Sequence, residues 1–128
     1  MQRESWLPAE PESAAAARTL VRNAAGELGL GQAAVWDLLL ATTEAVANAV
    51  KHGASCDRDG IMLRIESGSD GLCVEVCDCG RFTPRVELPG PWALDGRGLP
   101  IIAAVSDHFE IEPTAEETRV RFGKRLAA

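Results

Sequence analysis

The segment Glu44-Ala-Val-Ala-Asn48-Ala-Val-Lys51-His52-Gly53 decides how the rest of the chain is interpreted. It places a carboxylate, a carboxamide and an imidazole at Glu44, Asn48 and His52, each four residues after the one before. Residues four apart lie on the same face of a helix, so these groups form a polar ladder. Gly53 is placed to end the helix. The segment therefore predicts a helix with chemically useful groups along one side.

The same helix extends towards the N-terminus from the ladder. Glu44 lies nearly opposite the middle of its apolar face, which by itself indicates a solvated polar surface. Leu40 and Ala41 flank Glu44 on that side and favour a half-covered cleft instead. Spacing alone leaves both interpretations open. The helix is expected from about Gln32 to His52, and its apolar face consists of Val35, Leu38, Leu39, Thr42, Ala45, Val46, Ala49 and Val50.

The other elements follow from periodicity. An earlier helix is expected from Ser13, as its N-cap, to Gly29. Alternating apolar residues predict short strands near 5–7, 61–65, 72–77, 109–111 and 120–122. The second and third of these are joined through Gly68-Ser-Asp-Gly71 and are expected to form a hairpin. A short helix is expected from Leu99 to about Val105. This order predicts one domain over residues 1–128. Its fold class is α+β, a two-layer sandwich with helices on one face of a mainly antiparallel mixed sheet.

Two further polar stations come later in the chain. Asp78 ends a strand and shares a face with Val74 and Val76, and Gly80 beyond it lets a ligand approach the backbone. A carboxylate there suits recognition of an amino group, although an ordinary turn aspartate gives the same pattern. Residues 81–98, rich in proline and glycine, form a long loop, which is usually functional or disordered.

The second of these stations is Gly96-Arg97-Gly98-Leu99-Pro100, which joins a cation to a helix start. The N–H groups of a first helical turn attract phosphates, although a simple joint between loop and helix has the same composition. The chain has no GxxxxGK[ST] loop and no strand-following GxGxxG. The three stations together suggest a nucleotide site of another type.

Bulk composition limits the possible partners. With 13 basic and 19 acidic side chains the net charge is −6, and no broad basic cluster is present, so direct nucleic-acid binding is not expected. The apolar runs are short and interrupted by charges, and no signal-like segment begins the chain, so we expect no membrane span and a cytoplasmic location. Cys73 and Cys77 are expected as reduced thiols on one side of a strand, too far apart to bridge. A metal site of Cys77 and Cys79 with His52 or His108 is the alternative.

With these residues in place, the chain resembles the GHKL (Bergerat-fold) ATPases, and among them the anti-sigma-factor serine/threonine kinases of bacteria. The resemblance covers nearly the whole length. It is carried by Leu7-Pro-Ala-Glu-Pro-Glu-Ser13, Thr43-Glu44-Ala-Val-Ala-Asn48-Ala-Val-Lys-His52-Gly53, Val76-Cys-Asp78-Cys-Gly80-Arg, Gly96-Arg-Gly98-Leu-Pro and Glu117-Thr118-Arg-Val120.

The resemblance implies a role for each matched residue. Asn48 would hold Mg²⁺ on the phosphates of ATP, and Glu44 would accept the proton of a serine or threonine hydroxyl. Asp78, helped by Thr118, would bind the adenine amino group. The rest of the nucleotide site would comprise Lys51, His52, Gly80, Arg97, Gly98 and Leu99.

The resemblance also implies partners. The family phosphorylates an anti-anti-sigma (STAS-domain) protein, sequesters a sigma factor by partner switching, and commonly forms homodimers through its sheets. Arg18 is near the family's sigma-factor contact, although it is equally well read as a solvated arginine. The chain departs from the family pattern at Arg81, Phe82 and Glu117, each expected to narrow the nucleotide pocket. A non-catalytic binding module with the same fold, or a kinase-like domain of a larger phosphatase/kinase regulator, is therefore the alternative.

Overall fold

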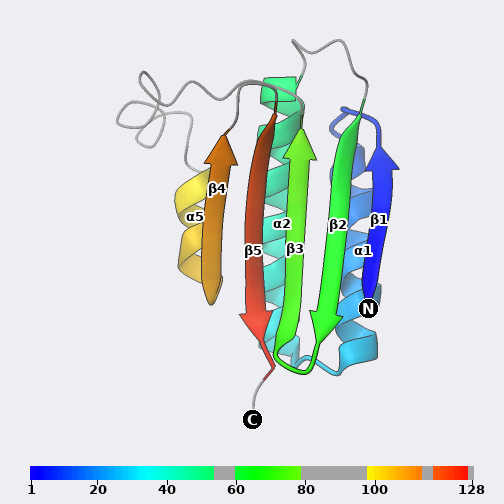
Figure 1. The fold of residues 1–128 in the computed structure, drawn as a ribbon, viewed down its shortest axis with the longest axis vertical. Coiled ribbons are helices and arrows are strands. Elements are labelled where there is room, and N and C mark those ends of the chain that lie inside the picture. The colour runs from blue at the N-terminus through cyan, green and yellow to red at the C-terminus, as the bar shows by residue number, and fades with distance from the viewer. Residues whose placement is uncertain (54–59, 79–97, 114–116, 127–128) are drawn as a thin grey trace.

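The computed structural model describes residues 1–53, 60–78, 98–113 and 117–126. These residues form three helices and five strands (Figure 1). In chain order the elements are β1 (Gln2–Leu7), α1 (Ser13–Leu28), α2 (Gln32–Gly53), β2 (Ile61–Gly68), β3 (Gly71–Asp78), α5 (Gly98–Val105), β4 (His108–Pro113) and β5 (Thr118–Arg125).

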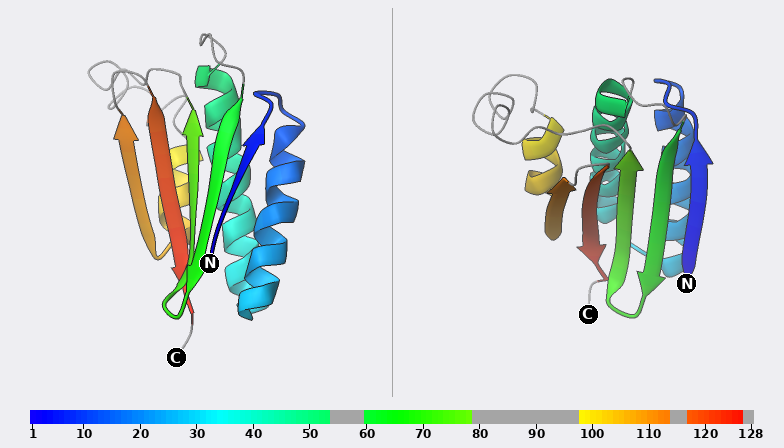
Figure 2. Two further views of the ribbon diagram at one scale, coloured as in Figure 1. Left: turned by 45° about the vertical axis from the view of Figure 1, so that its right-hand side comes forward. Right: turned by 45° about the horizontal axis from the view of Figure 1, so that its top comes forward.

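The elements form two layers. The sheet has the strand order β1-β2-β3-β5-β4, and the helices lie on one of its faces (Figures 1 and 2). The predicted two-layer α+β fold is confirmed. The sheet is antiparallel at every pairing of its described strands rather than mixed. The antiparallel pairing of β1 with β2 follows from the two helices between them. These helices return the chain to the end of the sheet where β1 finishes, so β2 runs in the opposite direction.

Helix α1 begins differently from the prediction. Ser13 is its first residue and not its N-cap, because its hydroxyl donates to the Pro8 carbonyl oxygen at 2.5 Å. Glu12 occupies the cap position without a side-chain hydrogen bond. At the other end Gly29 has φ 87°, and its N–H donates to the Ala25 carbonyl oxygen. A left-handed glycine of this kind commonly ends a helix, as the sequence predicted.

Helix α2 is the central helix of its layer and packs against α1, α5 and the sheet. Most of the predicted apolar face is buried, with Val35 and Val50 partly buried. The helix is also more apolar overall than we expected. Gln32–Lys51 is long and apolar enough to cross a membrane by length and composition, with 20 residues at a mean hydropathy of 1.2. In the structure it covers the sheet, and a core helix passes the same test.

The hydrophobic core lies between the two layers. Alternate residues of β2 and β3 face it, such as Leu63 and Val74, with Phe122 from β5. The turn between β2 and β3 requires glycine at 71, where φ is 150° and a Cβ would collide with the Lys124 carbonyl oxygen. The predicted hairpin through residues 68–71 is therefore confirmed, with Gly68 paired to Gly71.

A single lysine ties the two layers together at one end of the sheet. The Lys124 ammonium of β5 donates to Asp37 Oδ2 of α2 at 3.0 Å and to the Val105 carbonyl oxygen at 3.0 Å. Its side chain is only 16% exposed, so both bonds are largely shielded from water. Lysine thus satisfies the end of α5 and holds the first turns of α2 on the last strand.

Candidate nucleotide-binding site

The elements that carry the described site residues end or begin at one end of the molecule. Figure 1 shows the C-terminal end of α2, the end of β3 and the beginnings of β5 and α5 at the same end of the two layers. The right view of Figure 2 turns this end towards the reader. Segments that lie far apart in the sequence therefore lie near one another at this end of the fold.

Asp78 and Thr118 form the strand side of this end. They are direct partners in the register of β3 and β5, and both are buried, at 6% and 5% exposure. Asp78 continues the covered face of β3 after Val74 and Val76, as the sequence predicted. Each of the two side chains has an interaction partner in the structure. A buried carboxylate and hydroxyl side by side can read a donor and acceptor pattern such as a purine edge.

Asn48 forms the helix side. Its side chain is half-buried, and its Nδ2 atom is buried without a hydrogen-bond partner. A buried amide nitrogen without a partner is costly, so the group is suited to a ligand. Which amide atom is oxygen is assigned from the hydrogen-bond network, and a rotated amide turns its oxygen into the same place. Carboxamide oxygen is a preferred Mg²⁺ ligand, so this residue fits the metal that the resemblance implies.

Glu44 lies one turn before Asn48 and is partly exposed. On one flank Ala41 is fully buried, whereas Leu40 on the other flank is 43% exposed. The side of α2 that carries Glu44 is thus covered on one flank and open on the other. This agrees with the half-covered cleft rather than with a fully solvated face. A carboxylate in such a position can accept a proton while protein substrates still reach it.

Of the remaining predicted residues, the structure describes some completely, some only in their backbone and some not at all. Lys51 is exposed and has an interaction partner. Gly98 opens α5, and the side chain of Leu99 is buried in the core, so only its backbone is suited to a ligand. The helix position of His52 is described but its side chain is not, and Gly80 and Arg97 lie outside the described residues.

Two predicted features lie elsewhere than expected. Glu117 forms an ion pair with Arg119 at 2.7 Å on the uncovered side of the sheet, so its side chain does not narrow the covered end. Arg18 donates to Thr43 Oγ1 of α2 at 3.1 Å and is therefore not simply solvated. Arg81, Phe82 and the whole predicted 81–97 loop lie outside the described residues.

The uncovered face of the sheet carries a feature that the sequence analysis missed. One register row crosses all five strands with alternating charge, and we call it the charged row: Glu4, Arg64, Glu75, Arg121 and Glu110. Glu75 is only 4% exposed and accepts hydrogen bonds from Arg64 and Arg121, each at 2.8 Å. The pairing of each strand with its neighbours was the information that sequence patterns lacked.

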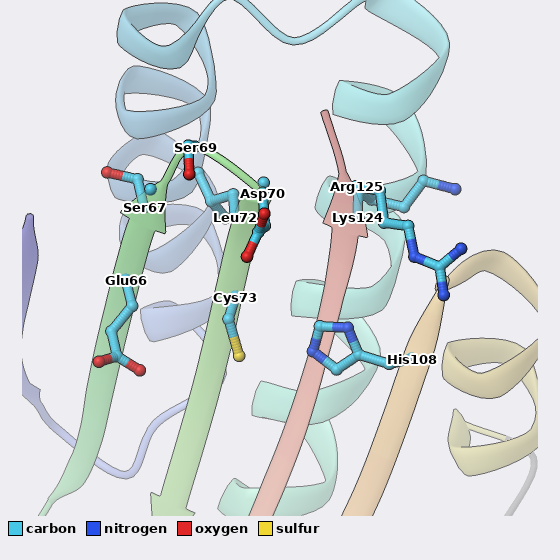
Figure 3. A pocket seen from close by; sticks show the side chains of 11 residues that line it. Glu66, Ser67, Ser69, Asp70, Leu72, Cys73, His108, Lys124 and Arg125 are labelled. Carbon is cyan, nitrogen blue, oxygen red and sulfur yellow. The ribbon is translucent and has the colours of Figure 1, made fainter. Parts of the chain in front are cut away.

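A pocket of about 530 Å³ lies at the hairpin end of the sheet, opposite the predicted site (Figure 3). The His108 ring lies over β5, where Gly123 has no side chain to obstruct it. Lys124 is already bonded to Asp37, and the Arg125 N–H donates to Asp107 at 2.6 Å. The Lys124 ammonium therefore has protein partners and is less available to an anion in the pocket.

The cysteines of β3 are free thiols on the uncovered face. Burial raises the pKa of both Cys73 and Cys77 to about 11, with nearby glutamates adding to the effect. Within the described ranges no group of three or more His, Cys, Asp or Glu side chains is arranged to hold a metal. Cys79, which the alternative metal site requires, lies outside these ranges.

Comparison with known proteins identifies the family of the chain. Residues 7–124 match the family model of the histidine kinase-like ATPase domain. The chain is 36% identical over 118 residues to proteins named serine-protein kinase RsbW in Listeria innocua and Listeria monocytogenes, covering 82% of this chain and 75% of theirs. A crystal structure of the RsbU and RsbW domains of a Mycobacterium tuberculosis protein superposes with a TM-score of 0.79 at 25% identity. It covers 100% of this chain, which spans only 33% of that one.

These findings define the class. The chain belongs to the histidine kinase-like ATPase domain family. Within it the chain stands with the anti-sigma-factor serine/threonine protein kinases of the GHKL superfamily, as the motifs predicted.

Proposed function

We propose that this protein is an ATP- and Mg²⁺-dependent serine/threonine kinase that acts as an anti-sigma factor. The observation that supports it most is that α2, which carries the unpartnered buried amide nitrogen of Asn48, ends at the same end of the fold as the buried Asp78–Thr118 pair of β3 and β5. In this arrangement Asp78 and Thr118 would bind the adenine, and Asn48 would hold the metal. Gly98 and the backbone of Leu99 open a helix whose N–H groups suit phosphate oxygens.

Mg²⁺, when bound, supplies charge neutralisation of the phosphates. The chain's own residues position the reactants. The hydroxyl of a serine or threonine attacks the γ-phosphorus, a new O–P bond forms, and the bond to the ADP oxygen breaks. Glu44 accepts the hydroxyl proton. Its half-covered position supports this role, since the incoming hydroxyl belongs to a protein and needs an open approach.

The partners follow from the family. We propose that the phosphate acceptor is a STAS-type anti-anti-sigma protein and that the sequestered partner is a sigma factor, exchanged by partner switching in the cytoplasm. A homodimer formed through the uncovered sheet face is part of the same proposal.

Calorimetric titration tests the nucleotide site. The chain should bind ATP with Mg²⁺, and Asn48→Ala should reduce the gain in ATP affinity that Mg²⁺ gives. Incubation of the wild-type protein with γ-labelled ATP and STAS-domain proteins should then label one of them on serine or threonine. Partner binding without any detectable ATP binding would instead identify a non-catalytic module.

A second candidate has the same chemistry in a larger chain. The Mycobacterium tuberculosis structure described above contains an RsbU domain as well as its RsbW domain, and this chain spans 33% of it. A kinase-like domain of a larger phosphatase/kinase regulator would be recognised by the length of the endogenous protein. Immunoblotting a cell extract measures that length directly.

A further inference from the structure

Helix α2 exposes an apolar stripe on the side away from the sheet. Trp36 and Leu40, on successive turns, are 61% and 43% exposed. Ala33 and Ala47 are exposed and lie close to the same line along the helix, so the stripe continues in both directions. The outward side of a surface helix is normally polar. We call these four residues the α2 stripe.

The α2 stripe leads to the proposed catalytic carboxylate. Glu44 is one turn beyond Leu40 on the same helix, and a rise of about 1.5 Å per residue puts it roughly 12 Å along the axis from Trp36. A protein–protein interface typically buries about 800 Å² on each partner, a patch roughly 30 Å across, which is wider than this separation. A folded protein that brings a hydroxyl to Glu44 can therefore also cover Leu40 and Trp36.

The surroundings of the stripe match a protein interface. Arg18 of α1 is held beside it by the hydrogen bond to Thr43 at 3.1 Å, and Asp37 lies next to Trp36 in the sequence. Tryptophan and arginine are enriched at the energetic centres of interfaces, with polar groups around them. The carboxylate of Glu44, one turn beyond Leu40, and the absence of basic residues from the stripe itself disfavour an anionic membrane surface as the occupant. A second copy of the chain seated here would cover Glu44 and block the transfer.

We propose that the α2 stripe is the docking surface for the phosphate-accepting protein, which would present an apolar patch beside its accepted hydroxyl. The proposal rests on the proposed kinase function. It assigns substrate binding to residues that touch neither ATP nor the reacting atoms. Changes in the stripe should therefore alter KM for the protein substrate and leave the ATP site as it is.

The test uses Trp36→Gln, Leu40→Gln and the double variant, with the STAS-domain protein that the wild-type chain labels as substrate. We expect KM for that protein to rise at least tenfold in the double variant, with kcat at saturation and KM for ATP unchanged. Trp6→Gln is the matched control, because Trp6 is also 61% exposed but lies on the uncovered face of the sheet. Ala33→Arg, which adds bulk without removing a packed side chain, should also raise KM and guards against misfolding of the glutamine variants.

The outcomes separate the two proposals. If the wild-type chain labels no STAS-domain protein, the kinase proposal falls and the docking proposal with it. If the wild-type chain transfers phosphate but neither the double variant nor Ala33→Arg raises KM, only the docking surface is refuted. Loss of sigma-factor binding with an unchanged KM would also refute it and would give the stripe to the other partner.

Discussion

The two faces of the sheet satisfy their polar side chains in different ways. On the uncovered face Glu75 is buried beneath two arginines that each donate to it, so the charges complete one another. On the covered side Asp78 and Thr118 lie together at one end, and on the helix above them the Nδ2 atom of Asn48 has no partner. A polar cluster that is complete needs no ligand, whereas an incomplete one is suited to receive one. The comparison separates a structural cluster from a functional one.

The sharpest test of this contrast is Glu44→Gln. The substitution keeps the shape of the side chain but removes its ability to accept a proton, so kcat for phosphate transfer should fall by about 10² to 10⁴-fold. ATP affinity should be unchanged. Transfer is measured with γ-labelled ATP and the STAS-domain substrate. Glu66→Gln on the uncovered face is the control, and equal activity in both variants would remove Glu44 as the base.

The thiols of the uncovered face provide the second test. Since burial raises the pKa of Cys73 and Cys77 from 9.0 to about 11, the thiolate fraction near pH 8 should be about 100-fold below that of an ordinary cysteine. Alkylation with iodoacetamide, followed by peptide mass spectrometry, should be slower by a similar factor. It should accelerate as pH rises towards 11. Rates equal to those in the urea-unfolded chain would show that the sheet does not shield these thiols.

Asp78→Asn tests the strand side of the covered end. An amide in place of the buried carboxylate presents donors where the adenine amino group also donates, so ATP affinity should fall by about 10 to 100-fold. Isothermal calorimetry measures it. The control is Asp70→Asn in the turn at the opposite end of the sheet, which should leave affinity unchanged. Unaltered ATP binding by the Asp78 variant would exclude this residue from the pocket.

The smallest expected effect concerns the charged row. Glu75→Gln should lower the free energy of unfolding by about 1 to 2 kcal/mol, because a buried acceptor loses two charge-assisted bonds while both arginines stay partly hydrated. Glu110→Gln removes a pair that is 3.6 Å long and 68% exposed on the glutamate, and should cost less than about 0.5 kcal/mol. Urea denaturation compares the two. Equal decreases in the free energy of unfolding would mean that the buried Glu75 contributes no more to stability than the exposed Glu110.

Much of the fold could be predicted from the sequence, because half-buried helices and strands repeat their apolar residues at 3.6 or 2 positions. The helix end at Gly29 and the turn at Gly71 could also be predicted, because glycine adopts positive φ more readily than other residues, and both glycines do so in the structure. Ser13 was wrongly predicted as the N-cap of α1. Its hydroxyl donates to the Pro8 carbonyl oxygen, and this bond depends on the path of the chain before the helix rather than on helix propensity.

The site was predictable only in part. Asp78 and Thr118 could be singled out through a family resemblance, but their direct pairing joins strands 40 residues apart and depends on the sheet order. The charged row could not be predicted for the same reason. On each strand its members are ordinary alternating polar residues, and only the order and register of the five strands bring them into one row. Burial of Leu99 and the outward position of Glu117 likewise follow from tertiary packing.

The place of β5 in the sheet has a consequence for biosynthesis. This strand is the last of the five to leave the ribosome, yet it lies between β3 and β4 and carries the lysine that fastens α2 and α5. Until it emerges, β4 has no neighbour among the described strands and β3 presents an unpaired edge. Nascent chains stalled before residue 118 should therefore be prone to aggregation and sensitive to proteases. Folding should be completed only after that point in translation.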